Sequence, residues 1–287
     1  TLDRSSAASD VYKRQMNNFT LNQIRSQKQL TIIAGPCVIE DREMAIFTAK
    51  SLLEICKNHD IFLIFKASYD KANRSSIHSF RGVGLEKGLA ILEEIKTSFD
   101  IPVTSDVHSP IEVPSAAKVL DILQIPAFLC RQTDLLVTAA RTGKIVNVKK
   151  GQFMSPWEMK NVIEKIKNSG NDQIITTDRG TCFGYSNLVS DMRSIPIIKE
   201  YGSLVCFDAS HSVQLPAKEG SESGGQREFI PILAKAAIAS GADLVFFETH
   251  PEPSKARSDK SSQLSLDELD SLLPILKKLY TLINHAL

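Results

Sequence analysis

The sequence predicts a single (β/α)8 barrel, the α/β fold also called a TIM barrel, and three observations carry this prediction. Apolar, β-branched runs recur along the chain, segments with helical spacing separate them, and the alternation continues over about 250 residues. A doubly wound open sheet is the alternative, but no GxGxxG fingerprint follows the first run. We expect strands at about 30–37, 61–67, 101–106, 121–125, 145–149, 173–178, 203–209 and 243–249.

The segments between these runs carry helix signals. Two of them place apolar residues on one helical face, namely Met44, Phe47, Leu52 and Ile55, and then Leu85, Leu89, Leu92 and Ile95. Ser155-Pro156-Trp157-Glu158 has the pattern of a capping box with Pro at the first helical position, and predicts a helix through Ile166. Ser265-Leu266-Asp267-Glu268 predicts the start of the last helix in the same way, and we expect Pro274 to kink or restart it.

Length and composition are typical of a globular enzyme. The chain has 287 residues, of which 43% are hydrophobic and 23% charged, and its net charge is +1. This balance gives no electrostatic footprint for nucleic acid or an anionic membrane, and no apolar run approaches the length that crosses a bilayer. The five cysteines form neither a CxxC pair nor the pattern of a small secreted domain. We therefore expect reduced thiols and a cytoplasmic protein.

The first residues differ from the rest of the chain. Residues 1–15 are polar, rich in Ser and Ala, and lack the apolar core of a signal peptide. With Met16 as the natural start, we expect 1–15 to be a non-native or disordered leader. A weak transit peptide is the alternative, which Asp3 and Asp10 disfavour. Residues 16–287 are expected to form one catalytic domain without a linker.

A basic, hydroxyl-rich stretch follows the second predicted strand. Lys66, Lys71 and Arg74, together with Ser and Asn side chains, emerge where an apolar strand ends. Loops at the carboxyl ends of parallel strands surround the open mouth of the barrel, which is where ligands bind. Lys and Arg suit phosphate, and Ser and Asn add neutral donors. A solvated basic turn is the alternative, but it does not explain so close a junction with a buried strand. The stretch predicts an anion site.

Each predicted strand changes from apolar to ionisable or polar residues at its carboxyl end. We therefore expect the rim that these ends form to be the active site. Five cations supply more positive charge than one phosphate needs, and they predict a heavily anionic set of ligands. They are Lys66, Lys71, Arg74, Lys149 and Arg179.

A second group on the rim has the composition of a metal site. Cys37, His211 and Glu248 follow strands one, seven and eight, which are neighbours in a closed barrel, and Asp259 lies in the loop after strand eight. A thiolate, an imidazole and two carboxylates suit a borderline divalent ion, with Zn2+ or Fe2+ favoured by the sulfur. Each residue also has a purely structural explanation, such as a small buried hydrophobe for Cys37. The residues alone leave both explanations open.

The chain resembles the 3-deoxy-D-manno-octulosonate 8-phosphate (Kdo8P) synthases, from about Leu30 to the C-terminal helix. These enzymes condense phosphoenolpyruvate with arabinose 5-phosphate. The motifs that carry the resemblance are Phe65-Lys66-Ala67-Ser68, Asp70-Lys71-Ala72-Asn73-Arg74-Ser75-Ser76, Arg81-Gly82, Gly84-Leu85-Glu86, Thr104-Ser105-Asp106-Val107-His108, Ile125-Pro126-Ala127-Phe128-Leu129, Arg131-Gln132-Thr133-Asp134, Asn147-Val148-Lys149-Lys150, Asp178-Arg179-Gly180, Phe183-Gly184-Tyr185 and Asn187-Leu188-Val189.

A sister family makes 3-deoxy-D-arabino-heptulosonate 7-phosphate from erythrose 4-phosphate, and it shares the barrel and the Gly-Pro-Cys element. It typically carries Lys-Pro-Arg-Thr where this chain has Lys71-Ala72-Asn73-Arg74. The resemblance therefore implies arabinose 5-phosphate as the acceptor, with the sister reaction as the alternative. It also implies a role in Kdo synthesis for lipopolysaccharide, or for pectic Kdo in plants.

The resemblance implies the metal-dependent type, because those members have Cys after strand one where the metal-independent members have Asn. It implies that Cys37, His211, Glu248 and Asp259 bind one divalent ion, with Zn, Fe or Mn expected. This chain departs from the family in one respect: Lys260-Ser261 follows Asp259 where Gly is usual. We expect this glycine-poor loop to be less mobile than usual.

The resemblance also implies roles for the remaining site residues. Lys66, Lys149 and Arg179 are expected to hold phosphoenolpyruvate. Arabinose 5-phosphate is expected to contact Ser68, Lys71, Asn73, Arg74 and Ser75. Arg74 and Ser75 are expected to reach its phosphate in a neighbouring subunit of a homotetramer. The expected catalytic residues are Lys71, Asp106, Lys149 and His211, and Gln124, Gln152 and Gln214 are expected to orient substrates.

Two other classes of function stay open from the sequence. One is a Schiff-base aldolase, in which Lys149 forms an imine with a ketone substrate. The other is a sugar-phosphate-binding regulator without chemistry, which has no use for a metal site beside the anion cluster.

Overall fold

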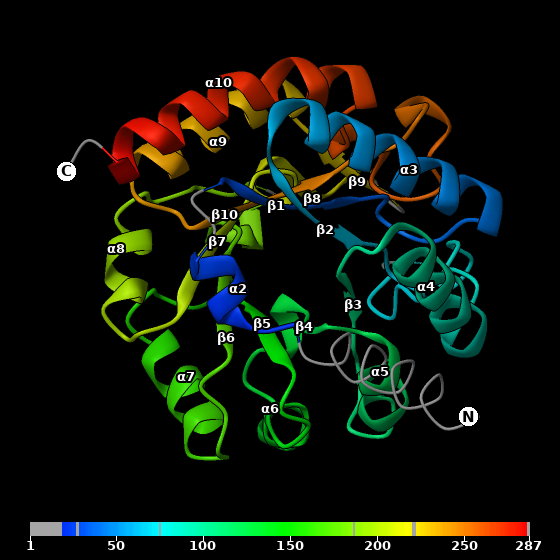
Figure 1. Ribbon diagram of the computed structural model, residues 1–287. Coiled ribbons are helices and arrows are strands. Elements are labelled where there is room, and N and C mark those ends of the chain that lie inside the picture. Colours follow the sequence, from blue (N-terminus) through cyan, green and yellow to red (C-terminus); the bar gives the residue numbers. More distant parts are fainter. Residues whose placement is uncertain (1–18, 27–28, 75, 186, 220–221, 286–287) are drawn as a thin grey trace, which may run out of the picture.

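The chain forms a closed barrel of parallel strands, as a computed structural model shows (Figure 1). The structure describes residues 19–26, 29–74, 76–185, 187–219 and 222–285, so the expected leader 1–15 lies outside the described residues. The strands lie in the order β1-β10-β7-β6-β5-β4-β3-β2. The predicted fold is confirmed, and each barrel strand falls within its predicted range. Their bounds are β1 Thr31–Gly35, β2 Phe62–Lys66, β3 Val103–Asp106, β4 Ile122–Ile125, β5 Ile145–Lys149, β6 Ile174–Asp178, β7 Leu204–Asp208 and β10 Leu244–Glu248.

Helices surround the barrel, and one further helix lies across its amino-terminal end (Figure 1). That helix, α2 (Leu21–Ser26), packs Leu21 and Ile24 on apolar side chains of the barrel interior such as Ile33 and Ile145. The outer helices are α3 Arg42–His59, α4 Leu85–Phe99, α5 Val113–Val119, α6 Thr133–Ala140, α7 Met159–Lys167, α8 Ser194–Lys199, α9 Ile230–Ala239 and α10 Leu266–His285.

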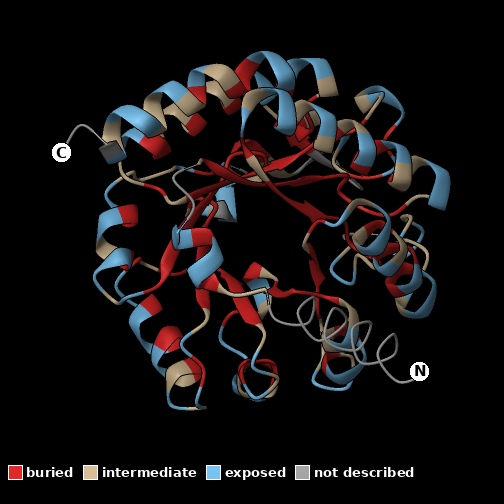
Figure 2. Ribbon diagram, viewed as in Figure 1, coloured by how far each residue is buried: buried red, intermediate tan, exposed pale blue. Residues whose placement is uncertain are grey.

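Buried residues occupy the strands and the inward faces of the helices (Figure 2). The barrel strands are buried on both faces: Ile32 packs in the layer between strands and helices, whereas its neighbour Ile33 packs in the barrel interior. This explains why the strands read as continuous apolar runs in the sequence.

Glycine at position 35 allows the first two strands to approach closely at the site. Gly35 pairs with Glu248 at the carboxyl ends of β1 and β10. A Cβ atom on Gly35 would lie 2.0 Å from the carbonyl oxygen of Lys66, a distance that no side chain tolerates. Gly35 therefore brings Lys66 and Glu248 to the same part of the rim.

Two predictions about helices need correction. Helix α7 begins at Met159, and residues 156–158 form a turn, because the Ser155 hydroxyl bonds to the Glu158 carboxylate (3.1 Å). Only half of that capping box forms, through the Ser155 N–H, which donates to Glu158 at 2.8 Å. Helix α10 runs unbroken through Pro274, so the expected restart is wrong and the expected kink stays a prediction; the buried leucine face of the helix packs against the core.

The capping box of the last helix is confirmed. The Ser265 N–H donates to the Glu268 carboxylate (2.8 Å), and the Glu268 N–H donates to the Ser265 hydroxyl (3.1 Å).

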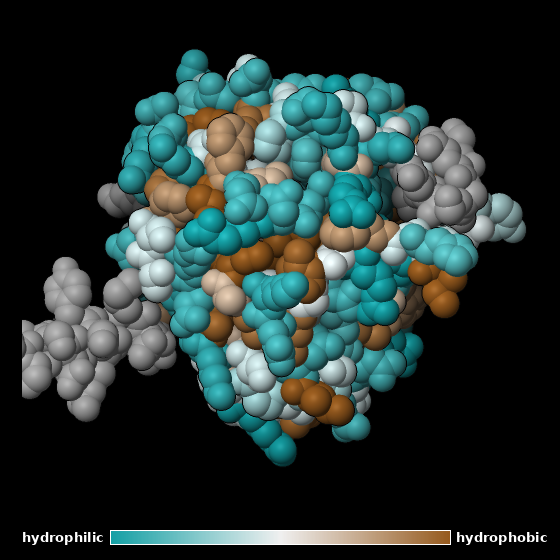
Figure 3. All heavy atoms as spheres, turned by 90° about the vertical axis from the view of Figure 1, so that its right-hand side faces the viewer, coloured by the Kyte–Doolittle hydropathy of each residue, from teal (hydrophilic) through white to brown (hydrophobic). Residues whose placement is uncertain are grey.

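An antiparallel hairpin, β8 (Gln214–Glu219) and β9 (Glu222–Gly225), follows β7 and was not predicted, because its sequence lacks apolar alternation. On the face shown in Figure 3, hydrophilic residues predominate and apolar residues form separate patches. Among the described residues, no helix combines the length and the apolar character that a bilayer crossing requires.

Candidate functional site

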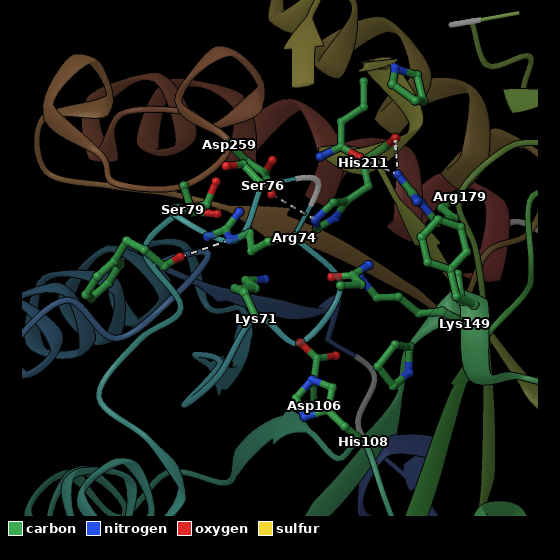
Figure 4. Close-up of a pocket in the computed structure, with 18 of the residues that line it drawn as sticks. Lys71, Arg74, Ser76, Ser79, Asp106, His108, Lys149, Arg179, His211 and Asp259 are labelled. Atoms are coloured by element: carbon green, nitrogen blue, oxygen red, sulfur yellow. Dashed lines mark hydrogen bonds and ion pairs between the residues drawn. The ribbon is translucent and has the colours of Figure 1, made fainter. Parts of the chain in front are cut away.

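A cavity of about 700 Å³ opens at the carboxyl ends of the barrel strands. Side chains from several strands and loops point into it (Figure 4). Predicted site residues that line it are Lys66, Lys71, Asn73, Arg74, Asp106, Lys149, Gln152, Arg179, His211, Gln214 and Asp259. Four others lie buried outside the lining, namely Cys37, Ser68, Gln124 and Glu248. Ser75 lies outside the described residues.

The predicted metal ligands gather at one side of this cavity. One ligand atom each of Cys37, Glu248 and Asp259 lie within 4.8 Å of one another. His211 Nε2 lies 3.3 Å from Glu248 Oε1 and 3.9 Å from Asp259 Oδ2. The barrel order explains this grouping, because β1, β10 and β7 are neighbours.

The donor atoms fit a bound divalent ion. Burial, with Asp259 and Glu248 nearby, raises the pKa of the Cys37 thiol well above its ordinary value. A thiol so close to two carboxylates becomes a stable anion only when a cation lies among them. Glu248 Oε2 is buried and has no hydrogen-bond partner among the described residues, so it is available as a ligand. Thiolate, imidazole and carboxylate are the donors that Zn2+ and related first-row ions use.

Two neighbours hold these ligands in place. Asp208, at the end of β7, accepts from His211 Nδ1 at 2.8 Å and leaves Nε2 facing Glu248. Such a carboxylate partner is what metal-bound imidazoles usually have. Gln263 connects the Asp259 loop to β1, because its Nε2 donates to the Ser258 carbonyl (2.7 Å) and its Oε1 accepts from the Cys37 N–H (3.4 Å).

Lys66 and Lys71 lie beside the metal-ligand group. Lys66 Nζ is 3.2 Å from Glu248 Oε1, and Lys71 Nζ is 3.8 Å from the same oxygen. Burial, with Lys71 nearby, lowers the pKa of Lys66. Although burial opposes its charge, Cys37 and Glu248 raise the pKa of Lys71. Positive lysines thus lie beside the negative metal-ligand group, and Lys71 keeps a charged ammonium at the cavity.

Lys149 and Arg179 form the opposite side of the cavity (Figure 4). Lys149 Nζ lies 2.6 Å from Asp208 Oδ2 and 4.0 Å from the centroid of the Phe246 ring. Arg179 donates through Nη2 to the His211 carbonyl at 2.9 Å, while its Nε is buried without a described partner. Buried donors that stay unpaired are costly, so this side of the cavity is suited to an anion.

Asp106 lies at the base of the cavity with both oxygens hydrogen-bonded. Its Oδ2 accepts from the Ser68 hydroxyl (2.6 Å) and its Oδ1 from Gln124 Nε2 (2.7 Å). Although burial opposes ionisation, Lys66 and its lysine neighbours hold the pKa of Asp106 well below its ordinary value. Ser68 and Gln124 therefore support Asp106 from below the cavity.

Arg74 lines the cavity of its own chain, and its expected reach into a neighbouring subunit stays a prediction. Its Nε donates to the Phe80 carbonyl at 2.9 Å, and this bond turns the guanidinium group inward (Figure 4). Its Nη2 is buried without a described partner. Arg74 is thus an available anion donor.

Several residues of the site carry no role in the sequence analysis. Asp208 lies near the end of one predicted strand and His108 follows another, so their positions indicated the rim. Nothing in the sequence indicated which residues they contact. His108 lines the cavity and lies 3.4 Å from Glu112. Phe246 was predicted only as part of an apolar strand, yet the Lys149 ammonium packs over its ring.

Comparisons with known proteins place the chain among enzymes. The model of the DAHP synthetase I family matches residues 18–285. A "2-dehydro-3-deoxyphosphooctonate aldolase" of Protochlamydia amoebophila is 57% identical over 261 residues, which cover 91% of this chain and 95% of the relative. Proteins of the same name from Geobacter sulfurreducens and Geobacter metallireducens are 54% and 57% identical, over 91% and 90% of this chain and 96% and 94% of theirs. The resemblance to the Kdo8P synthases is confirmed.

Proposed function

This chain belongs to the DAHP synthetase I family, and from that premise we propose that it is a 3-deoxy-8-phosphooctulonate synthase. It condenses phosphoenolpyruvate, D-arabinose 5-phosphate and water to 3-deoxy-D-manno-octulosonate 8-phosphate and inorganic phosphate. This product serves Kdo and lipopolysaccharide synthesis. The observation that supports this function best is a cavity that combines cations for two phosphorylated substrates with a set of metal donors.

Phosphoenolpyruvate binds between Lys66, Lys149 and Arg179. These three cations come from β2, β5 and the residue after β6, and they line one cavity. Its phosphate and carboxylate each take charged hydrogen bonds, which Arg179 supplies as a fork and the lysines as point charges.

Arabinose 5-phosphate binds on the other side, toward Lys71 and Asn73. The unpaired Nη2 of Arg74 supports a role in binding the sugar phosphate. Asn73 supplies a neutral donor for a sugar hydroxyl or phosphate oxygen.

The reaction forms a carbon–carbon bond. C3 of phosphoenolpyruvate, a masked enol, attacks the aldehyde carbon of the open-chain pentose, whose oxygen takes up a proton. Positive charge develops at C2, and water adds there and loses a proton. The resulting phosphohemiketal breaks its C2–O bond and releases inorganic phosphate, which leaves the ketone of the product.

A divalent ion held by Cys37, His211, Glu248 and Asp259 supplies Lewis-acid polarisation and orientation of oxygen groups. The chain's own residues do the remaining work. Asp208 fixes the imidazole of His211, and Lys71 places positive charge beside the aldehyde. Asp106 accepts a hydrogen bond from a substrate hydroxyl or the attacking water.

Isotope labelling tests this route. With the reaction run in water labelled with oxygen-18, the label should appear at C2 of the product, and the released phosphate should contain none. Labelled phosphate would indicate ordinary hydrolysis of the phosphate ester, and it would contradict the proposed cleavage of the C–O bond.

A Schiff-base aldolase is disfavoured by the ion pair of Lys149. An ammonium held 2.6 Å from the Asp208 carboxylate has no lone pair for imine formation. Borohydride added with substrate should leave Lys149 unmodified, whereas covalent trapping at Lys149 would favour the aldolase.

We also propose that the enzyme is a homotetramer in the cytoplasm, where its five free thiols stay reduced. In this tetramer Arg74 and Ser75 reach the sugar phosphate in the neighbouring site, so a complete site needs residues of two subunits. Mixed oligomers of Arg74→Ala and Lys149→Ala subunits should then recover part of the activity. No recovery in demonstrably mixed oligomers would contradict the shared site, and sedimentation at assay concentration tests the tetramer.

A further inference from the structure

Five polar side chains form one row of hydrogen bonds across the barrel, and the row ends on Asp106. Thr177 Oγ1 donates to Asn147 Oδ1 (2.7 Å), and Asn147 Nδ2 donates to Gln124 Oε1 (3.1 Å). Gln124 Nε2 then donates to Asp106 Oδ1 (2.7 Å), and Ser68 donates to Asp106 from the other side (2.6 Å). The first four residues lie on adjacent strands, from β6 through β5 and β4 to β3.

The row is buried except where it meets the cavity. The side chains of Thr177, Asn147, Gln124 and Ser68 have no exposure to solvent, and only Asp106 lines the cavity. At its far end the Cys206 thiol is hydrogen-bonded to Thr177, and burial raises the pKa of this thiol, which keeps it protonated. These side chains are shielded from solvent, and each amide is held by its two neighbours in the row.

The direction of every bond follows from the charge of Asp106. An ionised carboxylate only accepts, so Gln124 must turn its NH2 group toward Asp106. Its carbonyl oxygen then faces Asn147, which must present its own NH2 group, and the Asn147 oxygen is left for the Thr177 hydroxyl. All donors point toward the cavity.

Asp106 is faced by cations from three places. Lys66 comes from β2, Lys71 from the loop after β2 and Lys149 from β5. His108, two residues after Asp106, lies just beyond the end of β3. These groups favour the ionised carboxylate, which agrees with the direction of the row.

We propose that Asn147 is a positioning residue for the reaction: it fixes the Gln124 amide so that Asp106 stays an oriented acceptor at the cavity. The row uses one lone pair on each Asp106 oxygen, and because Asp106 lines the cavity, each oxygen can still accept from a substrate hydroxyl or the attacking water. This inference rests on the proposed function, because it assigns Asp106 to that reaction.

Asn147→Asp tests the required donor. The shape and the bond from Thr177 are kept, but the new group donates to Gln124 only while it carries a proton. The variant has two buried carboxyl groups, that of Asp106 and the one introduced at position 147. Because the lysines hold Asp106 ionised, a proton that these two groups take up resides on the introduced carboxyl. We expect the kcat of Asn147→Asp to fall at least about tenfold below wild type at pH 8 and to approach it as the pH is lowered.

Asn147→Leu removes the donor without adding a titrating group, and it should be impaired at every pH. For Asn147→Asp, the ratio of variant to wild-type kcat should rise as the pH is lowered. A ratio that stays flat or falls would overturn the proposal.

A second pair of variants keeps the test decisive if the Asn147 variants do not fold. Thr177→Val removes the first donor and Thr177→Ser retains it, so kcat should fall at least about threefold in the first and stay near wild type in the second. Thr176→Val is the matched control. The Thr176 hydroxyl lies 3.1 Å from that of Ser203, and it is buried on the same strand outside the row.

Thr176→Val should lower the melting temperature without changing kcat. Equal kcat in Thr177→Val and Thr176→Val would overturn the proposal. The wild-type assay separates the two claims. No product from phosphoenolpyruvate and arabinose 5-phosphate would contradict the proposed function. If the wild type forms product and the Thr177 and Asn147 variants keep its kcat, only the role of Asn147 is contradicted.

Discussion

Lys149→Met removes the ammonium that connects the substrate cations to the metal-ligand group. Lys149 Nζ lies 2.6 Å from Asp208 Oδ2, and Asp208 in turn accepts from His211. The methionine side chain has similar length and fills the space above Phe246 without the charge. The variant therefore separates packing from electrostatics.

The magnitude follows from the burial of the pair. Lys149 and Asp208 side chains are 7% and 0% exposed. Removing one partner of a buried ion pair costs about 3–5 kcal/mol of unfolding free energy. Because His211 Nδ1 stays 2.8 Å from Asp208, we expect the lower end, about 3 kcal/mol. Loss of one charged hydrogen bond to phosphoenolpyruvate costs about 1.5–3 kcal/mol, which weakens binding at least about tenfold.

Urea unfolding measures the first quantity, and calorimetric titration with phosphoenolpyruvate measures the second. Lys96→Met is the matched control, since Lys96 Nζ lies 2.7 Å from Asp121, which is buried, and neither residue lines the cavity. It should lose stability and keep its affinity for phosphoenolpyruvate. Unchanged affinity in Lys149→Met, or equal weakening in Lys96→Met, would refute the reasoning.

Two further predictions concern the metal and pH. Chelation should abolish turnover, and Zn2+, Mn2+, Fe2+ or Co2+ should restore it; Cys37→Asn should lower the metal content of a folded protein, whereas the buried Cys56→Ser should not. Full activity in a metal-free preparation would argue against this site. Asp106 has a depressed folded-state pKa, so its ionised form stabilises the protein above its unfolded-state pKa of about 4, and this contribution is lost as the pH falls through the lower folded-state value. Asp106→Asn should therefore be less stable than wild type at pH 7, with a difference that narrows toward pH 3; a constant difference in urea unfolding would contradict this.

Most of the barrel could be predicted because its strands are buried on both faces. Continuous apolar runs mark such strands, and the change to polar residues marks where each one meets the rim. The helix starts were harder, since Ser155 and Glu158 satisfy each other within a turn and leave the helix to begin at Met159. Hairpin β8–β9 lacks the apolar alternation that indicates a strand in the sequence.

The site could be predicted to the level of its residues but not of their partners. The polar strand ends indicated the cations and the candidate metal donors, the resemblance implied their roles, and the barrel order brings them together. The roles of Asp208, Phe246 and Asn147 depend on contacts between strands that are distant in the sequence. The bond from Arg74 Nε to the Phe80 carbonyl was not predicted either. Short-range bonds of this kind leave no sequence pattern.

The most direct test of the central claim is phosphate release from phosphoenolpyruvate by the metal-loaded enzyme, with arabinose 5-phosphate and erythrose 4-phosphate compared side by side. The proposed function predicts release with arabinose 5-phosphate, matched mole for mole by the eight-carbon product, and little with erythrose 4-phosphate. Equal or faster release with erythrose 4-phosphate, or none with arabinose 5-phosphate, would contradict it.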